Sequence, residues 1–374
     1  MLDDPKPPSH SQLLPYSIAC VALCAAIWVG VRASLDSPRA SPDATPSEPE
    51  PRLETVTAPA PTDRLGFQEI WGYLMPGEES RWKDDTPLTD LALFDYRLSE
   101  TGSLKGKPNQ KAIARARRLG IRTHLVIAAA GNKSLLHLAL SPRHQVRGEL
   151  RKEILALPER HKVTGVQLDF ESLRREEWTH LASFCRELKS SWPRSVWLSL
   201  ALPARTRATG GERLYGQLAR VADRLLLMVY DQHWRGSSPG PVSGLTWCES
   251  VLECALGKIP SSKLIVGLPF YGRIWQRQSV ARSVSYPQAE RLIREKTSTV
   301  IHEPASSNSF TFQTEVTAEC WFEDARSLRA KLESARSKGF NKIGFWRLGQ
   351  EDREIWSVVE IEGRRESGRD TEKP

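Results

Sequence analysis

The stretch Val163-Thr164-Gly165-Val166-Gln167-Leu168-Asp169-Phe170-Glu171 carries the most information about this chain. Its apolar run of small and β-branched residues predicts a buried strand. Because side chains alternate along a strand, Asp169 and Glu171 point to the same side. Two such acids are costly unless they are paired, hydrogen-bonded or used in chemistry. They mark either a strand that ends in solvent or a buried site that keeps a carboxyl protonated near neutral pH.

Composition sets the broad class of protein. The 374 residues allow one large domain or two small ones, and 40% hydrophobic residues with 12 Trp suffice for a sizeable core. Tryptophan packs in cores and also stacks on sugar rings. The formal charge of +8 is scattered along the chain, which suits an anionic surface. The sequence contains no zinc-finger spacing, phosphate loop or RNA-binding motif, so we expect no nucleic-acid partner.

The six cysteines give no CxxC pattern, and we therefore expect no metal site. Cys20 and Cys24 fall in an apolar N-terminal segment. Two interpretations remain for the others: a Cys248–Cys254 disulfide in an exported domain, or buried free thiols.

The N-terminal region predicts attachment to a membrane. Residues 13–31 are almost wholly apolar and long enough to span a bilayer, so we assign 13–33 to a transmembrane signal anchor or a signal peptide, after a tail at 1–12. Residues 34–64 are rich in proline and predict a disordered linker. Residues 362–374 form a charged C-terminal tail. We expect a membrane-anchored protein whose globular part lies outside the cytoplasm, in the periplasm or on the cell surface, or a secreted one if the segment is cleaved.

The globular part, residues 65–361, alternates short apolar runs with amphipathic stretches. Eight runs predict strands: Glu69–Leu74, Asp90–Phe94, Thr123–Ala129, Gly165–Phe170, Val196–Leu202, Arg224–Tyr230, Lys263–Pro269 and Lys342–Trp346. Helical patterns lie between most of them, as at Gln110–Leu119, Arg175–Ser190, Arg213–Val221 and Glu323–Lys338. This pattern favours an α/β fold, a (β/α)8 TIM barrel, over an open doubly wound sheet. The long gap before the last strand predicts a small α+β insertion at about 274–320.

In such barrels, chemistry lies at the carboxyl ends of the strands. Acids, aromatics and an arginine gather at those ends here: Tyr73, Asp95, Asp169, Glu171, Tyr230, Asp231, Arg273 and Trp346. A lone tyrosine or tryptophan in this set is more often a core residue than a functional one. Their shared position favours a common site.

These motifs together resemble glycoside hydrolase family 18, the chitinase-like barrels, from about Gly66 to Trp356. The family's fourth-strand signature, Asp-x-x-Asp-x-Asp-x-Glu, falls on Thr164, Gln167, Asp169 and Glu171, so its last two acids match. Further matches are Met228-Val229-Tyr230-Asp231, Gly267 to Arg273, Trp321-Phe322-Glu323-Asp324 and Gly344 to Gly349. The amide at Gln167 is most similar to the spore-germination and cortex-lytic branch. On the third strand, Ala128-Ala129-Ala130-Gly131 replaces the family's Ser-x-Gly-Gly, so a hydrogen-bonding serine is missing.

The resemblance implies a glycosidase that hydrolyses β-linked polymers containing N-acetylglucosamine, such as peptidoglycan or chitin, through the acetamido group of the substrate. It implies Glu171 as the general acid, Asp169 as the group that orients the acetamido group, and Tyr230 as its hydrogen-bond donor. Asp231 and Trp346 would bind the sugar, Tyr73 would support Asp169, and Arg273 and Gln167 would contact substrate. Because Gln167 carries no charge, we expect Asp169 to ionise more readily than beside an aspartate.

The alternative is a non-catalytic, lectin-like envelope protein on the same barrel. The intact acid at Glu171 favours the enzyme. We expect no cofactor and a monomer.

Overall fold

The computed structural model describes residues 63–129, 133–171, 173–206, 212–276, 280–302, 307–314 and 316–364. The predicted membrane segment at 13–33, nearly all of the predicted linker and most of the C-terminal tail lie outside the described residues. Within the described ranges, no helix combines the length and apolar character that crossing a membrane requires.

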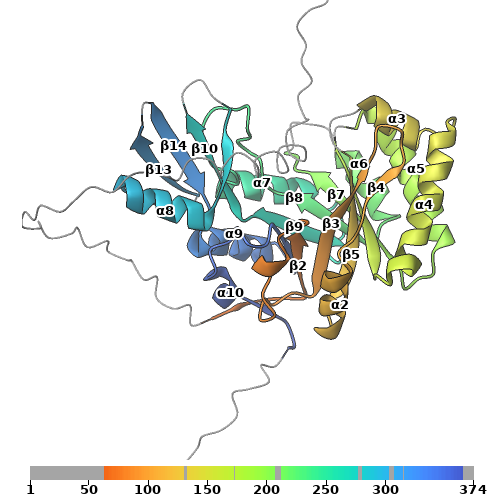
Figure 1. Ribbon diagram of the computed structural model, residues 1–374, viewed down its shortest axis with the longest axis horizontal. Helices are drawn as coiled ribbons and strands as arrows, with labels where there is room; N and C mark the ends of the chain where they lie inside the picture. Colours follow the sequence, from red (N-terminus) through yellow and green to blue (C-terminus); the bar gives the residue numbers. More distant parts are fainter. Residues whose placement is uncertain are drawn as a thin grey trace, which may run out of the picture.

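Eight parallel strands close into a barrel at the centre of Figure 1. They are β2 (Glu69–Leu74), β3 (Asp90–Leu98), β5 (Arg122–Ala129), β6 (Gly165–Phe170), β7 (Trp197–Pro203), β8 (Arg224–Met228), β9 (Leu264–Pro269) and β15 (Lys342–Trp346). The last strand, β15, pairs with both β9 and β2, and β2 also pairs with β3. The ring is therefore complete. The predicted (β/α)8 barrel is confirmed, and the open doubly wound sheet is wrong.

Helices surround the barrel between most strands (Figure 1). They are α2 (Gln110–Arg118), α3 (Lys133–Leu140), α4 (Gln145–His161), α5 (Arg175–Ser191), α6 (Glu212–Ala219), α7 (Leu245–Ala255), α9 (Ala325–Ser337) and α10 (Ile355–Val358). Between β2 and β3 the described chain forms the short 3-10 helix η1 (Glu79–Arg81) in place of an α-helix. The connection begins with Pro76-Gly77 and nears its end at Pro87, residues that interrupt a helix.

A second sheet lies between β9 and β15 in the sequence. It contains β10 (Tyr271–Gln276), β11 (Arg282–Ser285), β12 (Ile301–His302), β13 (Asn308–Gln313) and β14 (Thr317–Phe322), and α8 (Tyr286–Lys296) packs on it. This subdomain has its own apolar cluster around Phe310 and Phe322 and lies to the left of the barrel in Figure 1. It begins at Tyr271, before the predicted start at 274, because a single residue separates β10 from β9.

Short strands complete the described chain. The strand β1 (Leu65–Phe67) pairs in parallel with β16 (Val359–Ile361), which joins the two ends of the globular part. The strand β4 (Leu104–Gly106) forms a hairpin with the end of β3.

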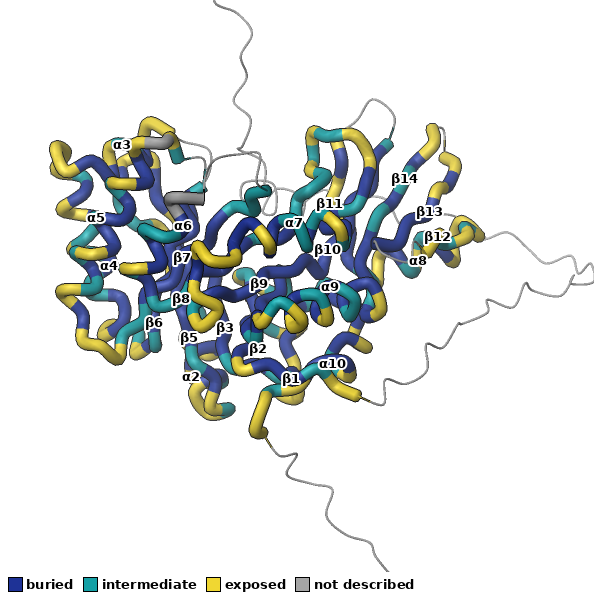
Figure 2. The backbone as a smooth tube through the Cα atoms, turned by 180° about the vertical axis from the view of Figure 1, so that it is seen from behind, coloured by how far each residue is buried: buried dark blue, intermediate teal, exposed yellow. Residues whose placement is uncertain are grey.

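Two apolar layers follow from the alternation of side chains along the strands. Outward-facing residues such as Leu91 and Leu125 pack under the helices, and inward-facing residues such as Trp71, Val126 and Ile265 fill the barrel. Figure 2 shows the barrel strands as mostly buried and the outer helix faces as exposed.

The four described cysteines, Cys185, Cys248, Cys254 and Cys320, are buried free thiols. The alternative of a Cys248–Cys254 disulfide is therefore wrong.

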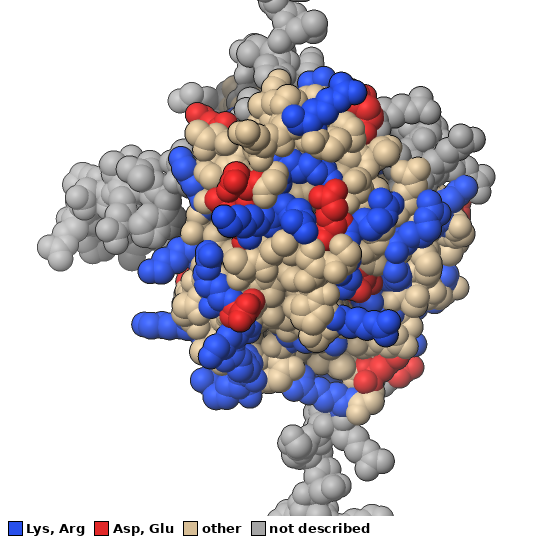
Figure 3. All heavy atoms as spheres, turned by 90° about the vertical axis from the view of Figure 1, so that its right-hand side faces the viewer, with Lys and Arg blue, Asp and Glu red and all other residues tan. Residues whose placement is uncertain are grey.

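The excess positive charge is spread out. On the face that carries α4 and α5, Figure 3 shows lysines and arginines distributed over the surface with acids between them. The scattered charge expected from the sequence is thus also seen on this face.

Candidate active site

A cavity of about 940 Å³ opens at the carboxyl ends of the strands. Seven of the eight predicted site residues line it: Tyr73, Asp169, Glu171, Tyr230, Asp231, Arg273 and Trp346. The loops after β7 and β8 and the subdomain strand β11 add further walls. Residues more than 270 positions apart in the chain thus meet at one rim.

The two acids of β6 lie on the wall of this cavity. Asp169 is buried, and its Oδ1 has no hydrogen-bond partner among the described residues. Burial raises its pKa well above the ordinary value, and the charge of the nearby Glu171 raises it further. Burial and the charge of Asp231 also raise the pKa of Glu171. Because each ionised carboxylate disfavours ionisation of its neighbour, the group retains a proton at higher pH than an isolated acid.

Gln167 lies deeper in the barrel and is fully buried. Its Oε1 accepts a hydrogen bond from the Tyr73 hydroxyl at 2.5 Å, and its Nε2 donates one to Ser199 Oγ at 3.2 Å. Tyr73 was expected to support Asp169, but its described hydrogen bond goes to Gln167. Gln167 itself, expected to contact substrate, is instead buried beneath the cavity, where it hydrogen-bonds Tyr73 and Ser199.

The uncharged side chain at position 167 does not leave Asp169 readily ionised. Burial and Glu171 together keep the pKa of Asp169 high. That Asp169 ionises more readily beside Gln167 than it would beside an aspartate stays a prediction.

Tyr230 and Asp231 follow the end of β8. Burial raises the pKa of the Tyr230 phenol well above its usual range, and the neighbouring Tyr73 and Asp169 act in the same direction. The hydroxyl therefore stays protonated and can donate a hydrogen bond. Asp231 adopts a left-handed backbone conformation, with φ of 61°.

Asp231 is held by two residues of β10. The Tyr271 hydroxyl and Arg273 Nη2 each donate to its Oδ1 at 2.5 Å. Arg273 lines the cavity as predicted, but its guanidinium is paired with this carboxylate rather than left open to a ligand. Tyr271 was missed in the sequence. Its position two residues before Arg273 could have identified it, because residues two apart in a strand lie on the same face.

Trp346 forms an aromatic surface at the end of β15. Its ring lies 5.4 Å from that of Tyr73 and 4.9 Å from that of Phe94, centroid to centroid. The ring is only partly buried and borders the cavity, so one face can meet an apolar surface such as a sugar ring.

The acid Asp95, at the predicted end of the second strand, is not among the cavity residues. Its Oδ2 accepts a hydrogen bond from the backbone nitrogen of Asn109 at 3.1 Å, and burial raises its pKa to about 6.

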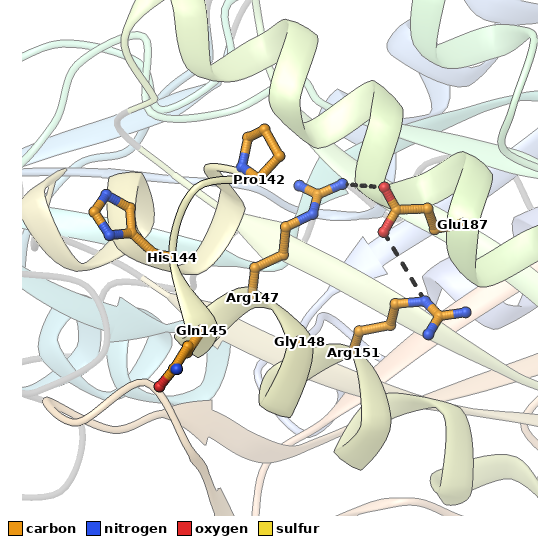
Figure 4. Close-up of a pocket in the computed structure, with 7 residues that line it drawn as sticks. All are labelled: Pro142, His144, Gln145, Arg147, Gly148, Arg151 and Glu187. Carbon is orange, nitrogen blue, oxygen red and sulfur yellow. Dashed lines mark hydrogen bonds and ion pairs between the residues drawn. The ribbon is translucent and has the colours of Figure 1, made fainter.

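A second hollow, of about 490 Å³, lies on the outer helices (Figure 4). Arg147 and Arg151 of α4 both pair there with Glu187 of α5, at 2.5 and 3.9 Å. The two arginines share this single carboxylate, and the hollow lies on the outer helices rather than at the strand ends, so it does not compete as the reaction site.

Across the ranges that the structure describes, no three or more His, Cys, Asp or Glu side chains are arranged to hold a metal ion.

The sequence and fold match known proteins. The pattern of glycosyl hydrolases family 18 matches residues 70–351. The cortical fragment-lytic enzyme of Bacillus subtilis is 26% identical over 291 residues, which cover 73% of this chain and 67% of that protein. The chain spans about two thirds of the length of the curated relatives that it matches first.

Two solved structures share the fold. The spore cortex-lytic enzyme SleL of Bacillus cereus has a TM-score of 0.73 at 24% identity, covering 80% of this chain and 76% of that one. A chitinase of Chromobacterium violaceum has a TM-score of 0.70 at 20% identity, covering 78% and 98%. The family match spans most of the chain and includes the strands that carry both acids. The chain therefore belongs to glycosyl hydrolases family 18.

Proposed function

We propose that this chain is a glycosidase that hydrolyses β-linked polymers containing N-acetylglucosamine, such as peptidoglycan or chitin. The observation that carries the proposal is the pair of buried Asp169 and partly buried Glu171, whose pKa values are both raised at the wall of a large cavity. A buried proton-holding carboxyl is what protonation of a glycosidic oxygen requires. The names of the relatives, a cortical fragment-lytic enzyme and a chitinase, support this class of substrate.

Glu171 is the general acid and base in this proposal. Its carboxyl gives its proton to the glycosidic oxygen as the bond from that oxygen to the anomeric carbon breaks. The acetamido oxygen of the same sugar forms a bond to the anomeric carbon in its place. The Glu171 carboxylate then takes a proton from water, the water oxygen replaces the acetamido oxygen, and the configuration at the anomeric carbon is retained.

Asp169 and Tyr230 act on the acetamido group. Once ionised, Asp169 accepts the acetamido N–H and stabilises the positive charge of the cyclic intermediate. The free Oδ1 of Asp169 supports this role, since a buried carboxylate oxygen is costly until it gains a donor. The Tyr230 phenol donates to the acetamido oxygen and keeps it near the anomeric carbon.

Asp231 and Trp346 position the sugar. Tyr271 and Arg273 hold the Asp231 carboxylate in one orientation at the wall of the cavity, where it can accept a hydrogen bond from a sugar hydroxyl. Trp346 provides the apolar floor.

The test is the replacement Glu171→Gln, assayed on N-acetylglucosamine oligomers and on peptidoglycan by release of reducing ends. Glu360→Gln on the exposed strand β16 is the matched control. We expect the control to cleave like the wild type and Glu171→Gln to lose activity. The proposal fails if the wild type cleaves neither polymer, or if Glu171→Gln cleaves as well as the wild type. Tight binding without cleavage by the wild type would support the lectin-like alternative.

We also propose that residues 13–33 anchor the barrel to a membrane, outside the cytoplasm, on the tether 34–64. The support is the apolar run and the proline-rich composition of the sequence. Fractionation of cells that express the full chain or residues 34–374 tests it: equal release of both into the soluble fraction contradicts an anchor.

A further inference from the structure

Arginines are prominent on the walls of the active-site cavity. Five line it: Arg205, Arg235, Arg273, Arg282 and Arg347. Two of these are neutralised by carboxylates, since Arg273 pairs with Asp231 and Arg347 pairs with Glu78 at 3.0 Å. Those two belong to the protein's own ion pairs.

The other three arginines, Arg205, Arg235 and Arg282, form no ion pair with a carboxylate of the described residues. Arg205 and Arg235 are partly buried and Arg282 is exposed. By contrast, the arginines of the outer hollow both pair with Glu187 (Figure 4). A guanidinium that lines a cavity without a carboxylate partner is available to an anionic ligand.

The backbone fixes where these arginines lie. Arg205 follows β7, Arg235 lies in the loop after β8, and Arg282 begins β11. The Ala281 nitrogen donates to the Arg235 carbonyl at 3.1 Å, and Trp275 Nε1 donates to the Ser237 carbonyl at 2.9 Å. These bonds fasten the loop after β8 to the subdomain, so Arg235 and Arg282 border the cavity from adjoining segments.

The charge of the cavity favours an anion. Its acids are Asp169, Glu171 and Asp231, and Asp231 is already paired with Arg273. The remaining two acids line the same cavity as three arginines that form no ion pair among the described residues. A neutral polymer makes ordinary hydrogen bonds with a guanidinium, whereas a carboxylate makes bidentate, charge-assisted ones.

We propose that Arg205, Arg235 and Arg282 form a subsite for carboxylate substituents, which selects carboxylate-bearing N-acetylglucosamine polymers over neutral ones. This inference rests on the proposed glycosidase function. It adds specificity-determining residues that act on substrate binding and leave the bond-breaking groups unchanged.

The experiment compares the wild type with the triple variant Arg205→Gln, Arg235→Gln and Arg282→Gln. The substrates are peptidoglycan fragments, the same fragments with all carboxyls amidated, and neutral N-acetylglucosamine oligomers. For the wild type we expect kcat/KM to be roughly 10-fold higher on the carboxylated fragments than on the amidated ones. The triple variant should lose this preference through KM, with kcat little changed, because the contacts are made before and during bond cleavage alike. Added salt should reduce the preference of the wild type.

The control is a second triple variant, Arg118→Gln, Arg294→Gln and Arg353→Gln. It removes three exposed charges outside the cavity and so separates local binding from net charge. We expect it to keep the preference. An amidase that removes the peptide exchanges the carboxylates of the peptide for one free carboxylate on the sugar. If these fragments are still preferred over their amidated form, a carboxylate on the sugar suffices; if the preference disappears, it is assigned to the carboxylates of the peptide.

Two results overturn the inference while leaving the glycosidase proposal intact. One is a wild type that cleaves carboxylated and amidated fragments equally well. The other is a triple variant that keeps the preference. A wild type that cleaves none of the polymers contradicts the proposed function itself. Should the triple variant not fold, single variants and binding of both fragment types to the Glu171→Gln protein give the same comparison.

Discussion

At the end of the barrel where the strands begin, buried acids are matched with cations, whereas Asp169 and Glu171 at the opposite end have no cationic partner among the described residues. Asp90 is fully buried and accepts hydrogen bonds from Arg122 at 2.7 and 2.6 Å and pairs with His124 at 2.9 Å. Burial alone would raise the pKa of Asp90, but these partners outweigh it and lower that pKa. Asp169 has no such partner in the part of the chain that the structure describes, and its pKa is raised.

The same difference extends to the neighbouring side chains. At the first end, Glu69 pairs with Arg224, and the Trp197 ring lies 4.5 Å from the guanidinium carbons of both Arg122 and Arg224. Both buried carboxylates of this network, Asp90 and Glu69, thus have cationic partners, as is typical of a structural ion-pair network. At the other end, Asp169 is buried without a cationic partner among the described residues, which costs stability. Such an arrangement is typical of a site that awaits a ligand.

The largest expected effect is on catalysis. Glu171→Gln should reduce kcat by roughly 10²- to 10⁴-fold, the usual contribution of a general acid. Unfolding in urea should show no loss of stability, because the replacement removes a carboxyl that burial disfavours. A variant that unfolds more easily and is inactive for that reason would break the comparison.

Next comes stability at the paired end. Asp90→Asn should lower the free energy of unfolding by about 3 kcal/mol. This is near the low end of the cost of breaking a buried ion pair, because the Arg122 side chain is about a third exposed and can regain contact with water. Activity per folded molecule should stay close to that of the wild type. Urea unfolding at neutral pH measures the first and active-site titration the second; an unchanged midpoint contradicts the expectation.

Replacing an aspartate by asparagine at the other end of the barrel should stabilise the protein rather than destabilise it. Asp169→Asn should raise the free energy of unfolding at pH 7, because burial and Glu171 disfavour the ionised carboxylate that the amide replaces. A raised folded-state pKa contributes stability that is present below the ordinary value of 3.8 and is lost as pH rises through the folded pKa. For Asp90 the lowered pKa contributes stability above 3.8 that is lost as pH falls through the folded pKa.

Urea unfolding of both aspartate variants from pH 4 to pH 8 tests these signs. The gain from Asp169→Asn should grow with pH. If this variant is less stable than the wild type at pH 7, the contrast between the two ends is wrong.

The smallest effect is expected at Gln167. In Gln167→Glu, a second carboxyl of similar shape is placed beside Asp169 and should raise the pKa of Asp169. Since Asp169 must ionise for catalysis in our proposal, the acid limb of the kcat/KM profile should move up by about one pH unit. Gln167→Met, of similar size and uncharged, is the control for lost hydrogen bonds. If the pH profile moves equally in both variants, the shift comes from the altered hydrogen bonds to Tyr73 and Ser199 and not from the added charge.

Much of the fold could be predicted because its signals are local. The apolar runs placed all eight barrel strands to within a few residues, and three of them, Glu69–Leu74, Gly165–Phe170 and Lys342–Trp346, coincide with β2, β6 and β15. The alternation at Asp169 and Glu171 also placed both acids on one side of a strand. The subdomain was foreseen from the length of the last gap, although its start at Tyr271 was not.

The amino-acid sequence by itself thus determined the strand and helix order and the pair of acids, since both depend on residues a few positions apart. Tertiary structure alone decided that the four described cysteines form no disulfide and which partners the site residues hold. The Tyr73–Gln167 bond joins residues 94 positions apart, and the Tyr271–Asp231 bond joins residues 40 apart. Such contacts depend on strand register and on how a subdomain packs against the barrel, and a local pattern of residues does not encode either.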